Sequence, residues 1–337
     1  MGTPGGTPAT TAQRWDIETL EPRLLMSADL APAPLHSYVM VEPPAPPADT
    51  APSYVFHRGD GVMTLGSDAP PNTYNILEFA GDIRPDEVSI ARIPDQLQPP
   101  EWGNYGGALQ MSVGSGGDRV VSSFFFVGDD PVNAQNHIQQ VRFASDGAVW
   151  TLQTLVDMAM QGTSGNDQLV GTTYDDTLDG GAGDDQLGDY AGNNTYLFGK
   201  GDGQDVIASY GDSTVAKLNT LQFKSGVTPE DVQLARPDQD GAPGTALVAT
   251  IASTGESVTI ESFFADNNPG NVYNPVQQIR FADGTTWDLA TLAIRAGAGG
   301  GGTTGNDVLA AADGNGDLLA GGDGDDGLTG GAGADAL

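Results

Sequence analysis

Apolar residues recur with two different periods after residue 160. In residues 161–205, one large apolar side chain returns every nine positions among glycine, aspartate and asparagine. These positions begin with Leu169, Leu178 and Leu187. In residues 206–298, apolar and polar side chains alternate over short stretches, which is typical of half-buried strands. The first period predicts very short strands joined by turns, and the second predicts a β-rich module.

The turns of the nine-residue region carry a fixed arrangement of glycine and aspartate. Residues 180–188 read G-G-A-G-D-D-Q-L-G, and an acid holds the same phase at Asp167, Asp176 and Asp185. Glycine permits backbone angles that a Cβ forbids, so carbonyl oxygens can turn toward one point. Calcium prefers shells of carboxylate and carbonyl oxygens. The turns therefore have the chemistry of a calcium site.

The same spacing predicts two edges with one cation position each. If two nine-residue units make one coil, Asp167 and Asp185 flank one ion, and Asp176 and Asn194 flank another on the opposite edge. Asn194 offers a neutral oxygen, so we expect the second position to bind more weakly. Tyr174 stands where a turn glycine is expected, which sets the middle unit apart.

The motif G-G-x-G-x-D-x-U-x, in which U is a large apolar residue, resembles the RTX or haemolysin-type calcium-binding repeat. The resemblance implies a parallel β-roll that binds Ca²⁺. A second array from residue 302 repeats the motif, has one unit a residue too long, and stops at the eighth position of its last unit, so we expect a truncated array. The expected calcium-binding positions are Gly162, Gly165, Asp167, Asp176, Gly180, Gly181, Gly183, Asp185, Asn194, Gly305, Asp307, Asp317, Gly321, Gly322, Gly324, Asp326, Gly330, Gly331, Gly333 and Asp335.

A duplicated module precedes each array. Residues 54–61 (Y-V-F-H-R-G-D-G) recur as residues 196–203 (Y-L-F-G-K-G-D-G), and Q-Q-V-R-F at residues 139–143 recurs as Q-Q-I-R-F at residues 277–281. The second copy continues into D-G-T-x-W at residues 283–287 and resembles the haemolysin-type calcium-binding-related module. The expected fold is mainly β, with two related β-rich modules alternating with short parallel β-roll arrays after a disordered N-terminus.

These patterns divide the chain into five expected segments. They are a leader with a Pro/Ala linker at residues 1–52, a first module at 53–160, a β-roll array at 161–205, a second module at 206–298 and a second array at 299–337. In the second module, residues 246–251 and 257–260 predict a hairpin, and Asp288 is placed to cap a short helix. Trp150 and Trp287 are expected core anchors, because both follow the same strand pattern.

Charge and composition exclude some classes of binding partner. The chain has 45 acidic and 13 basic residues, a net charge of −32, and no cysteine. An acidic chain repels nucleic acid and anionic membranes, and no run of about twenty apolar residues is present to span a bilayer. A secreted protein without disulfides needs another staple, and a metal ion fits that role.

The N-terminal region lacks the pattern of a signal peptide. Residues 20–29 read L-E-P-R-L-L-M-S-A-D and resemble the LEPR-xLL motif of very long, exported, adhesin-like bacterial repeat proteins. The RTX resemblance implies secretion from a Gram-negative cell through a one-step, type I exporter, followed by folding in external calcium.

Catalytic motifs are absent from the sequence. It has no H-E-x-x-H, no G-x-S-x-G and no cysteine nucleophile. The histidines His36, His57 and His137 are expected at the solvent-exposed surface, and the last two become glycine and proline in the second copy. Trp102 and Tyr105 lie in a loop unique to the first module and are the better candidates for stacking on a sugar.

We therefore expect a protein that is not an enzyme, whose repeats bind calcium and drive folding of a secreted structural or adhesin-like chain. One alternative is the non-catalytic part of a secreted RTX enzyme or toxin. Another is binding of cell-surface or matrix carbohydrate by the modules. Secretion machinery is an expected partner, whereas nucleic acid and a membrane span are not.

Overall fold

The computed structural model describes residues 39–47, 50–66, 74–93, 107–210, 212–239, 242–296, 300–301, 308–310, 319–320 and 327–329. These residues belong to one compact unit, Leu35–Leu337. The expected disordered leader with its LEPR-xLL motif, His36, and the loop with Trp102 and Tyr105 lie outside the described residues.

Two four-stranded sheets form the first module. One has the order β1-β3-β7-β8 and consists of β1 (Tyr54–Phe56), β3 (Ile76–Phe79), β7 (Gln140–Phe143) and β8 (Val149–Thr151). The other has the order β2-β6-β5-β4 and consists of β2 (Val62–Leu65), β6 (Asp118–Ser122), β5 (Ala108–Val113) and β4 (Val88–Ile93). The 3-10 helices η1 (Pro85–Glu87) and η3 (Val127–Asp129) and the helix α1 (Leu152–Ala159) complete it.

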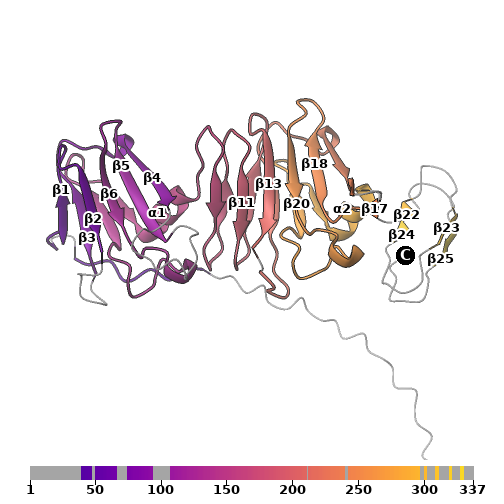
Figure 1. Ribbon diagram of the computed structural model, residues 1–337, viewed down its shortest axis with the longest axis horizontal. Helices are drawn as coiled ribbons and strands as arrows, with labels where there is room; N and C mark the ends of the chain where they lie inside the picture. Colours follow the sequence, from indigo (N-terminus) through magenta and orange to yellow (C-terminus); the bar gives the residue numbers. More distant parts are fainter. Residues whose placement is uncertain are drawn as a thin grey trace, which may run out of the picture. The chain divides into compact units, whose positions relative to one another are not determined.

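The first array and the second module share two longer sheets (Figure 1). The first sheet contains β10 (Thr177–Asp179), β12 (Thr195–Phe198), β14 (Thr220–Phe223), β20 (Gln278–Arg280) and β21 (Thr286–Asp288), in that order. The second contains β15 (Val232–Ala235), β18 (Leu247–Ile251), β19 (Ser257–Ile260), β13 (Gln204–Ser209), β11 (Gln186–Asp189) and β9 (Gln168–Val170), in that order. Further short elements are η4 (Pro229–Asp231), η5 (Ala265–Asn267), α2 (Leu289–Arg295) and the two-stranded pair β16 (Asp238–Gln239) and β17 (Ala242–Pro243).

The strand order repeats the duplication seen in the sequence. In one sheet of each copy three parallel strands lie side by side, β1-β3-β7 and β12-β14-β20. The third of them pairs with an antiparallel strand, β8 or β21, which leads into a helix. In the second copy, however, β12 and β13 also pair with the array strands β10 and β11. Strand β13 crosses the expected boundary between residues 205 and 206, so the array and the module are continuous in both sheets.

The nine-residue phase produces the predicted β-roll. Leu169 pairs with Leu187 across parallel strands β9 and β11, and Leu178 pairs with Tyr196 across β10 and β12. Partners lie eighteen residues apart, so two units make one coil as predicted. The inward apolar residues are buried, with Leu178 and Tyr196 fully enclosed. The mainly β fold with parallel β-roll coils is thus confirmed.

Aromatic stacks hold both module cores in the same way. Phe79 lies on Phe143 with ring centroids 5.2 Å apart, and Phe223 lies on Phe281 at the same separation. Trp150 contacts Phe143 edge-on at 4.6 Å, and Trp287 contacts Phe281 at 4.7 Å. The prediction that the two tryptophans anchor the cores is confirmed.

Local predictions for the second module also agree with the structure. Strands β18 and β19 form the expected antiparallel hairpin. The Asp288 side chain accepts a hydrogen bond from the Thr291 amide at 2.8 Å and caps α2. The expectation of surface histidines is wrong for His137, which is only 5% exposed. The segment that contains His137 packs against the core, and the next residue, Ile138, is fully buried.

The array is packed against the first module at its other end. Arg92 of β4 donates from Nη1 to the carbonyl oxygens of Val170 and Gly171 at 2.8 and 2.9 Å. The Tyr174 hydroxyl donates to Asp130 Oδ1 at 3.0 Å. Tyr174 therefore replaces a turn glycine at a point where the coil contacts the module. A module covers each end of the coils, as a solenoid requires.

Part of the expected linker also contacts the first module. Residues 39–47 contain no helix or strand, in agreement with the prediction, yet Met40 is buried. The Glu42 carboxylate accepts a hydrogen bond from the amide of Gln153 in the first turn of α1. An acid at that position is favourable, because helix N-termini carry unpaired amides.

Four short strands are described in the second array. They are β22 (Gly300–Gly301), β23 (Val308–Ala310), β24 (Leu319–Ala320) and β25 (Gly327–Thr329). β22 pairs with β24 and β23 with β25, both in parallel. Leu309 and Leu328 are partners nineteen residues apart, so the extra residue of the long unit is absorbed within the coil. No helix in the described ranges is long and apolar enough to cross a membrane.

Candidate calcium-binding site

Three turns follow one another along one edge of the array, which we call the first edge. They comprise residues 162–167, 180–185 and 199–205. The Asp167 amide donates to Asp185 Oδ1 at 2.8 Å, and the Asp185 amide donates to Asp205 Oδ1 at 3.0 Å. Each aspartate thus reaches back to the turn before it. The structure brings Asp167 and Asp185 together as the spacing predicts, and it adds Asp205.

Two carboxylate oxygens on this edge have nothing to satisfy them. Asp185 and Asp205 are each 2% exposed, and their Oδ2 atoms have no hydrogen-bond partner in the described part of the chain. In the first turn, by contrast, Asp167 Oδ2 accepts from the Thr163 amide at 2.6 Å and from its hydroxyl at 2.8 Å. Buried carboxylates normally have partners, so each orphaned oxygen is a candidate ligand for a cation.

Burial also raises the proton affinity of these acids. Desolvation, together with the nearby carboxylates of Asp185 and Asp202, raises the pKa of Asp205 to about 7. Desolvation likewise raises the pKa of Asp185, with Asp167 and Asp202 adding to the shift. Hence these groups bind a proton more readily than surface aspartates do.

Glycine is required where the turns stack. A Cβ on Gly162 would lie 1.9 Å from the Gly180 carbonyl oxygen. Gly181 has φ +85°, and a Cβ there would lie 2.3 Å from the Thr163 oxygen. A Cβ on Gly183 would lie 2.7 Å from the Gly165 oxygen. The turns therefore stack backbone against backbone, with carbonyl oxygens between them.

Carbonyl oxygens have to supply part of any ion's shell. Among the described residues, no three acidic, histidine or cysteine side chains converge as a ready-made metal cluster. Calcium takes six to eight oxygen ligands and accepts backbone carbonyls as well as carboxylates. The donor set of the first edge, carboxylates beside stacked glycine carbonyls, therefore fits calcium.

The opposite edge, which we call the second edge, is satisfied by its own hydrogen bonds. The Asp176 amide donates to Asn194 Oδ1, the Asn194 amide to Asn219 Oδ1, and the Asn219 amide to Gln277 Oε1, each at 2.7 Å. Asp176 Oδ2 accepts from the Thr172 amide at 2.6 Å and from its hydroxyl at 2.8 Å. The structure thus joins Asp176 and Asn194 as predicted, but it leaves neither with a buried orphaned oxygen.

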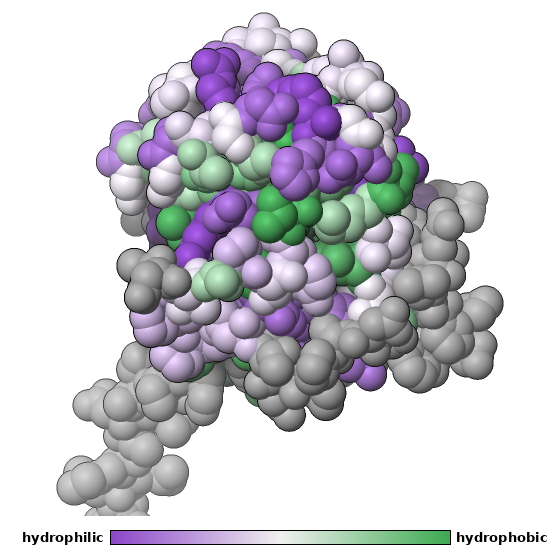
Figure 2. Space-filling model, turned by 90° about the vertical axis from the view of Figure 1, so that its left-hand side faces the viewer, coloured by the Kyte–Doolittle hydropathy of each residue, from purple (hydrophilic) through white to green (hydrophobic). Residues whose placement is uncertain are grey.

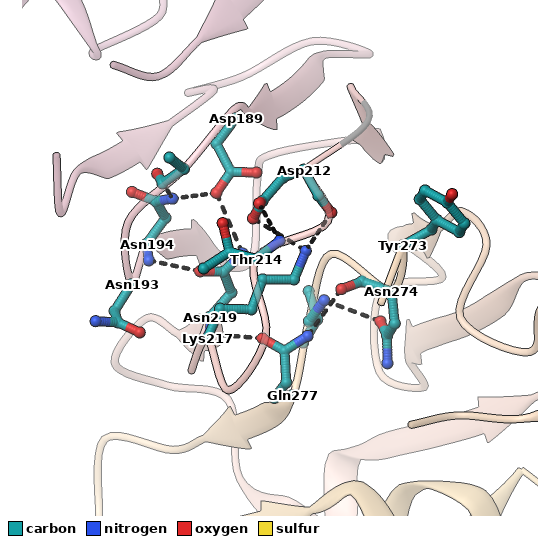
Figure 3. Close-up of polar contacts among 12 residues, drawn as sticks. Asp189, Asn193, Asn194, Asp212, Thr214, Lys217, Asn219, Tyr273, Asn274 and Gln277 are labelled. Atoms are coloured by element: carbon teal, nitrogen blue, oxygen red, sulfur yellow. Dashed lines mark hydrogen bonds and ion pairs between the residues drawn. The ribbon is translucent and has the colours of Figure 1, made fainter. Parts of the chain in front are cut away.

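A buried ion pair lies beside the row of hydrogen-bonded side chains on the second edge (Figure 3). Asp189 accepts hydrogen bonds from the side-chain amides of Asn194 and Asn219. Lys217 Nζ lies 3.0 Å from Asp212 Oδ2, and both side chains are almost fully enclosed. Burial and the Asp212 charge raise the pKa of Asp189 to about 7, while Lys217 and Asn194 lower it.

Sequence reasoning missed Asp205, which extends the row of hydrogen-bonded side chains on the first edge. It also missed Asn219 and Gln277, which extend the row on the second edge. Asp205 follows Asp185 by twenty positions and not eighteen, and Asn219 follows Asn194 by twenty-five. Gly201, Asp202 and Gly203 repeat the glycine-aspartate chemistry of the array and were the available signal for Asp205. Asn219 and Gln277 carry no such signal, because loops of different lengths precede them.

The expected positions of the second array lie outside the described residues. They are Gly305, Asp307, Asp317, Gly321, Gly322, Gly324, Asp326, Gly330, Gly331, Gly333 and Asp335.

Comparisons with known proteins agree with the repeat pattern. Residues 161–196 and 301–337 match the RTX calcium-binding nonapeptide repeat. Residues 247–291 match the haemolysin-type calcium binding protein related domain. These matches confirm that the chain carries RTX repeats, a class of Ca²⁺-binding sequence, together with a related module.

Similarity to individual proteins covers smaller parts. The iron-regulated protein FrpA of Neisseria meningitidis serogroup C is 34% identical over 98 residues, which make up 29% of this chain and 8% of FrpA. The chain therefore spans less than a tenth of that relative's length. The extracellular lipase LipA from Serratia marcescens is 16% identical, with a TM-score of 0.21, over 62% of this chain and 33% of the lipase.

Proposed function

We propose that the first edge binds calcium between its stacked turns, with Asp185 and Asp205 as the principal acidic ligands and Asp167, whose Oδ2 atom already accepts two hydrogen bonds from Thr163, as a weaker one. The orphaned Oδ2 atoms of Asp185 and Asp205 carry this proposal. Glycine carbonyls of the stacked turns supply the remaining oxygens. Asp185 belongs to the middle turn, so it serves the ion position on either side of it.

In this proposal, calcium binding at the first edge drives the folding of the array. In the absence of a cation, the charged forms of Asp185 and Asp205 are disfavoured by desolvation and by neighbouring carboxylates, and both effects raise their pKa values. Ordering the glycine turns also costs more entropy than ordering other residues. Calcium supplies positive charge and oxygen coordination, which offset both costs. The array therefore becomes ordered as its ligands are neutralised.

The expected second-edge site is weaker in this proposal. Asp176 and Asn194 present one charge between them, and their oxygens already accept hydrogen bonds from the turn. Calcium affinity rises with the number of charged ligands, so occupancy should begin on the first edge.

Exchanging one aspartate on each edge tests the assignment. In Asp185→Asn, we expect calcium affinity in isothermal titration calorimetry of the full chain to fall by about tenfold or more, because one charged ligand is lost from the middle turn. The matched control is Asp176→Asn, which removes the acid of the same phase on the second edge. If the two variants bind calcium as the parent does, the ligand assignment is wrong.

At the level of the whole protein, we propose a secreted structural or adhesin-like chain from a Gram-negative bacterium, exported through a type I system. The RTX arrays, the LEPR-xLL resemblance and the lack of catalytic motifs in the sequence support this role. Calcium then acts as the signal that the chain has reached the cell exterior.

Two other roles are kept as alternatives. A non-catalytic part of a secreted RTX enzyme or toxin is compatible with the local similarity to FrpA. Carbohydrate binding rests on the aromatic residues of the first-module loop. Fractionation of cells and culture medium tests the favoured role: we expect the chain at the cell surface or in the medium, and a purely cytosolic protein would contradict it.

A further inference from the structure

All three lysines of this acidic chain lie at the junction of the first array and the second module. They are Lys200, Lys217 and Lys224. Each contacts an aspartate: Lys200 lies 2.9 Å from Asp231, Lys217 lies 3.0 Å from Asp212, and Lys224 lies between Asp179 and Asp202 at 2.6 and 2.8 Å. Because all the lysine side chains pair with aspartates at this junction, we infer that they share a structural role there.

Lys217 is the most completely enclosed of the three. Its side chain is 4% exposed and that of Asp212 is 3% exposed. Nζ also donates to the Asp212 carbonyl oxygen at 2.9 Å. A lysine is rarely buried so fully unless it is paired. Removing one partner of such a pair leaves an uncompensated charge, which is strongly destabilising.

The position of this ion pair on the second edge is informative. It lies at the turn that follows residues 189–194 on that edge, and the Asn193 side chain accepts from the Leu218 amide at 2.8 Å across these two turns. Asp189 lies close to the same ion pair: the charge of Asp212 raises its pKa, and the charge of Lys217 lowers it. Neither Asp189 nor Asp212 has a buried oxygen without a hydrogen-bond partner, unlike Asp185 and Asp205 on the first edge.

We propose that the ammonium group of Lys217 takes the place of a metal ion on the second edge and closes the coil between residues 189–194 and 212–219 without calcium. The second module and the coil next to it then stay folded without calcium, and we call this part of the molecule the calcium-independent base. Coils farther from this base, which contain no lysine, depend on calcium.

Lys224 supports this interpretation on the other edge. It follows β14 and binds Asp179, which immediately precedes the second turn of the first edge, and Asp202, which lies within the third turn. In the sequence of the first copy, Ala80 stands at the equivalent of Lys224 and Thr73 at that of Lys217. Strands β1 and β2 of that copy pair only with strands of their own module in the described chain. The lysines thus occur in the copy on which a β-roll coil is stacked.

Hydrogen exchange of the full chain in chelator tests this proposal independently of calcium binding. In the parent, we expect residues 189–194 and 212–219 to be protected without calcium. In Lys217→Met, protection there should fall by about a hundredfold, the lower end of the effect of breaking a buried ion pair. Calcium should restore part of it, because Asp189 and Asp212 are then free to bind the ion.

Two control variants separate charge from packing. Lys200→Met removes the half-exposed lysine that pairs with Asp231, and it should keep protection at the parent level. Lys217→Arg keeps a positive charge and should retain most of it. The proposal is overturned if the parent needs calcium for protection at residues 212–219, if Lys217→Met is protected like the parent, or if arginine fails as completely as methionine.

Discussion

At the residue scale, the residue at the second position of three turns decides whether the aspartate four residues later is satisfied within its own turn. Thr163 and Thr172 donate both amide and hydroxyl to the aspartate four residues later. Gly181 has no hydroxyl, and its amide donates to Asp179 at 3.1 Å. Consequently Asp185 keeps a buried oxygen without a partner. Two hydrogen bonds, one from an amide and one from a hydroxyl group, separate the turns of Asp167 and Asp176 from the turn of Asp185.

The raised pKa of Asp205 predicts a pH-dependent calcium affinity. Because this pKa is about 7, a proton competes with calcium below pH 7. Affinity should therefore fall as the pH is lowered from 8 to 5.5, by about tenfold per unit below the pKa for one linked proton. Calorimetry at three pH values measures this. A constant affinity across the range would mean that Asp205 is not a ligand.

The same shift has the opposite effect on the calcium-free protein. Folded Asp205 binds its proton more tightly than the unfolded residue, whose pKa is about 4. Between pH 4 and pH 7 the folded state therefore holds more protons, and stability falls as the pH rises. Thermal unfolding in chelator should show a lower melting temperature at pH 8 than at pH 5. Calcium should remove most of this difference.

At the element scale, the turns demand glycine for two separable reasons. Gly181 (φ +85°) and Gly255 (φ +84°) have the same left-handed backbone conformation, but only Gly181 faces a carbonyl oxygen, 2.3 Å from where a Cβ would lie. Gly255→Ala should cost about 1 kcal/mol from its left-handed conformation alone. Gly181→Ala should cost about 2–4 kcal/mol, because the stacked turns must also separate.

Urea unfolding of both variants in saturating calcium provides the comparison. Equal losses of unfolding free energy would contradict the close stacking of the turns. A larger loss for Gly181→Ala, together with weaker calcium binding, is the expected result.

Sequence periodicity predicted the elements that repeat and missed those that do not. The nine-residue phase gave the pairs Asp167/Asp185 and Asp176/Asn194, because every unit between them has the same length. Asp205 and Asn219 escaped it, since two and seven additional residues enter the coils before them. The burial of His137 was missed because it depends on how one loop folds back onto its own module.

At the scale of the whole molecule, the first array is not an independent domain between two modules. Its strands β10 and β11 continue the sheets of the second module, and Arg92 and Tyr174 join it to the first module. Coils of so few units bury little apolar surface by themselves, so these neighbours supply the ends that a solenoid requires. Short arrays alternating with modules are thereby able to fold.

The central claim is that calcium orders the first edge, on a base that is already folded. The most direct measurement is hydrogen exchange of the full chain across a calcium titration, with magnesium as the control ion. We predict that residues 162–185 gain protection with calcium but not with magnesium, while residues 212–223 are protected throughout. Equal protection of residues 162–185 with and without calcium would contradict the account.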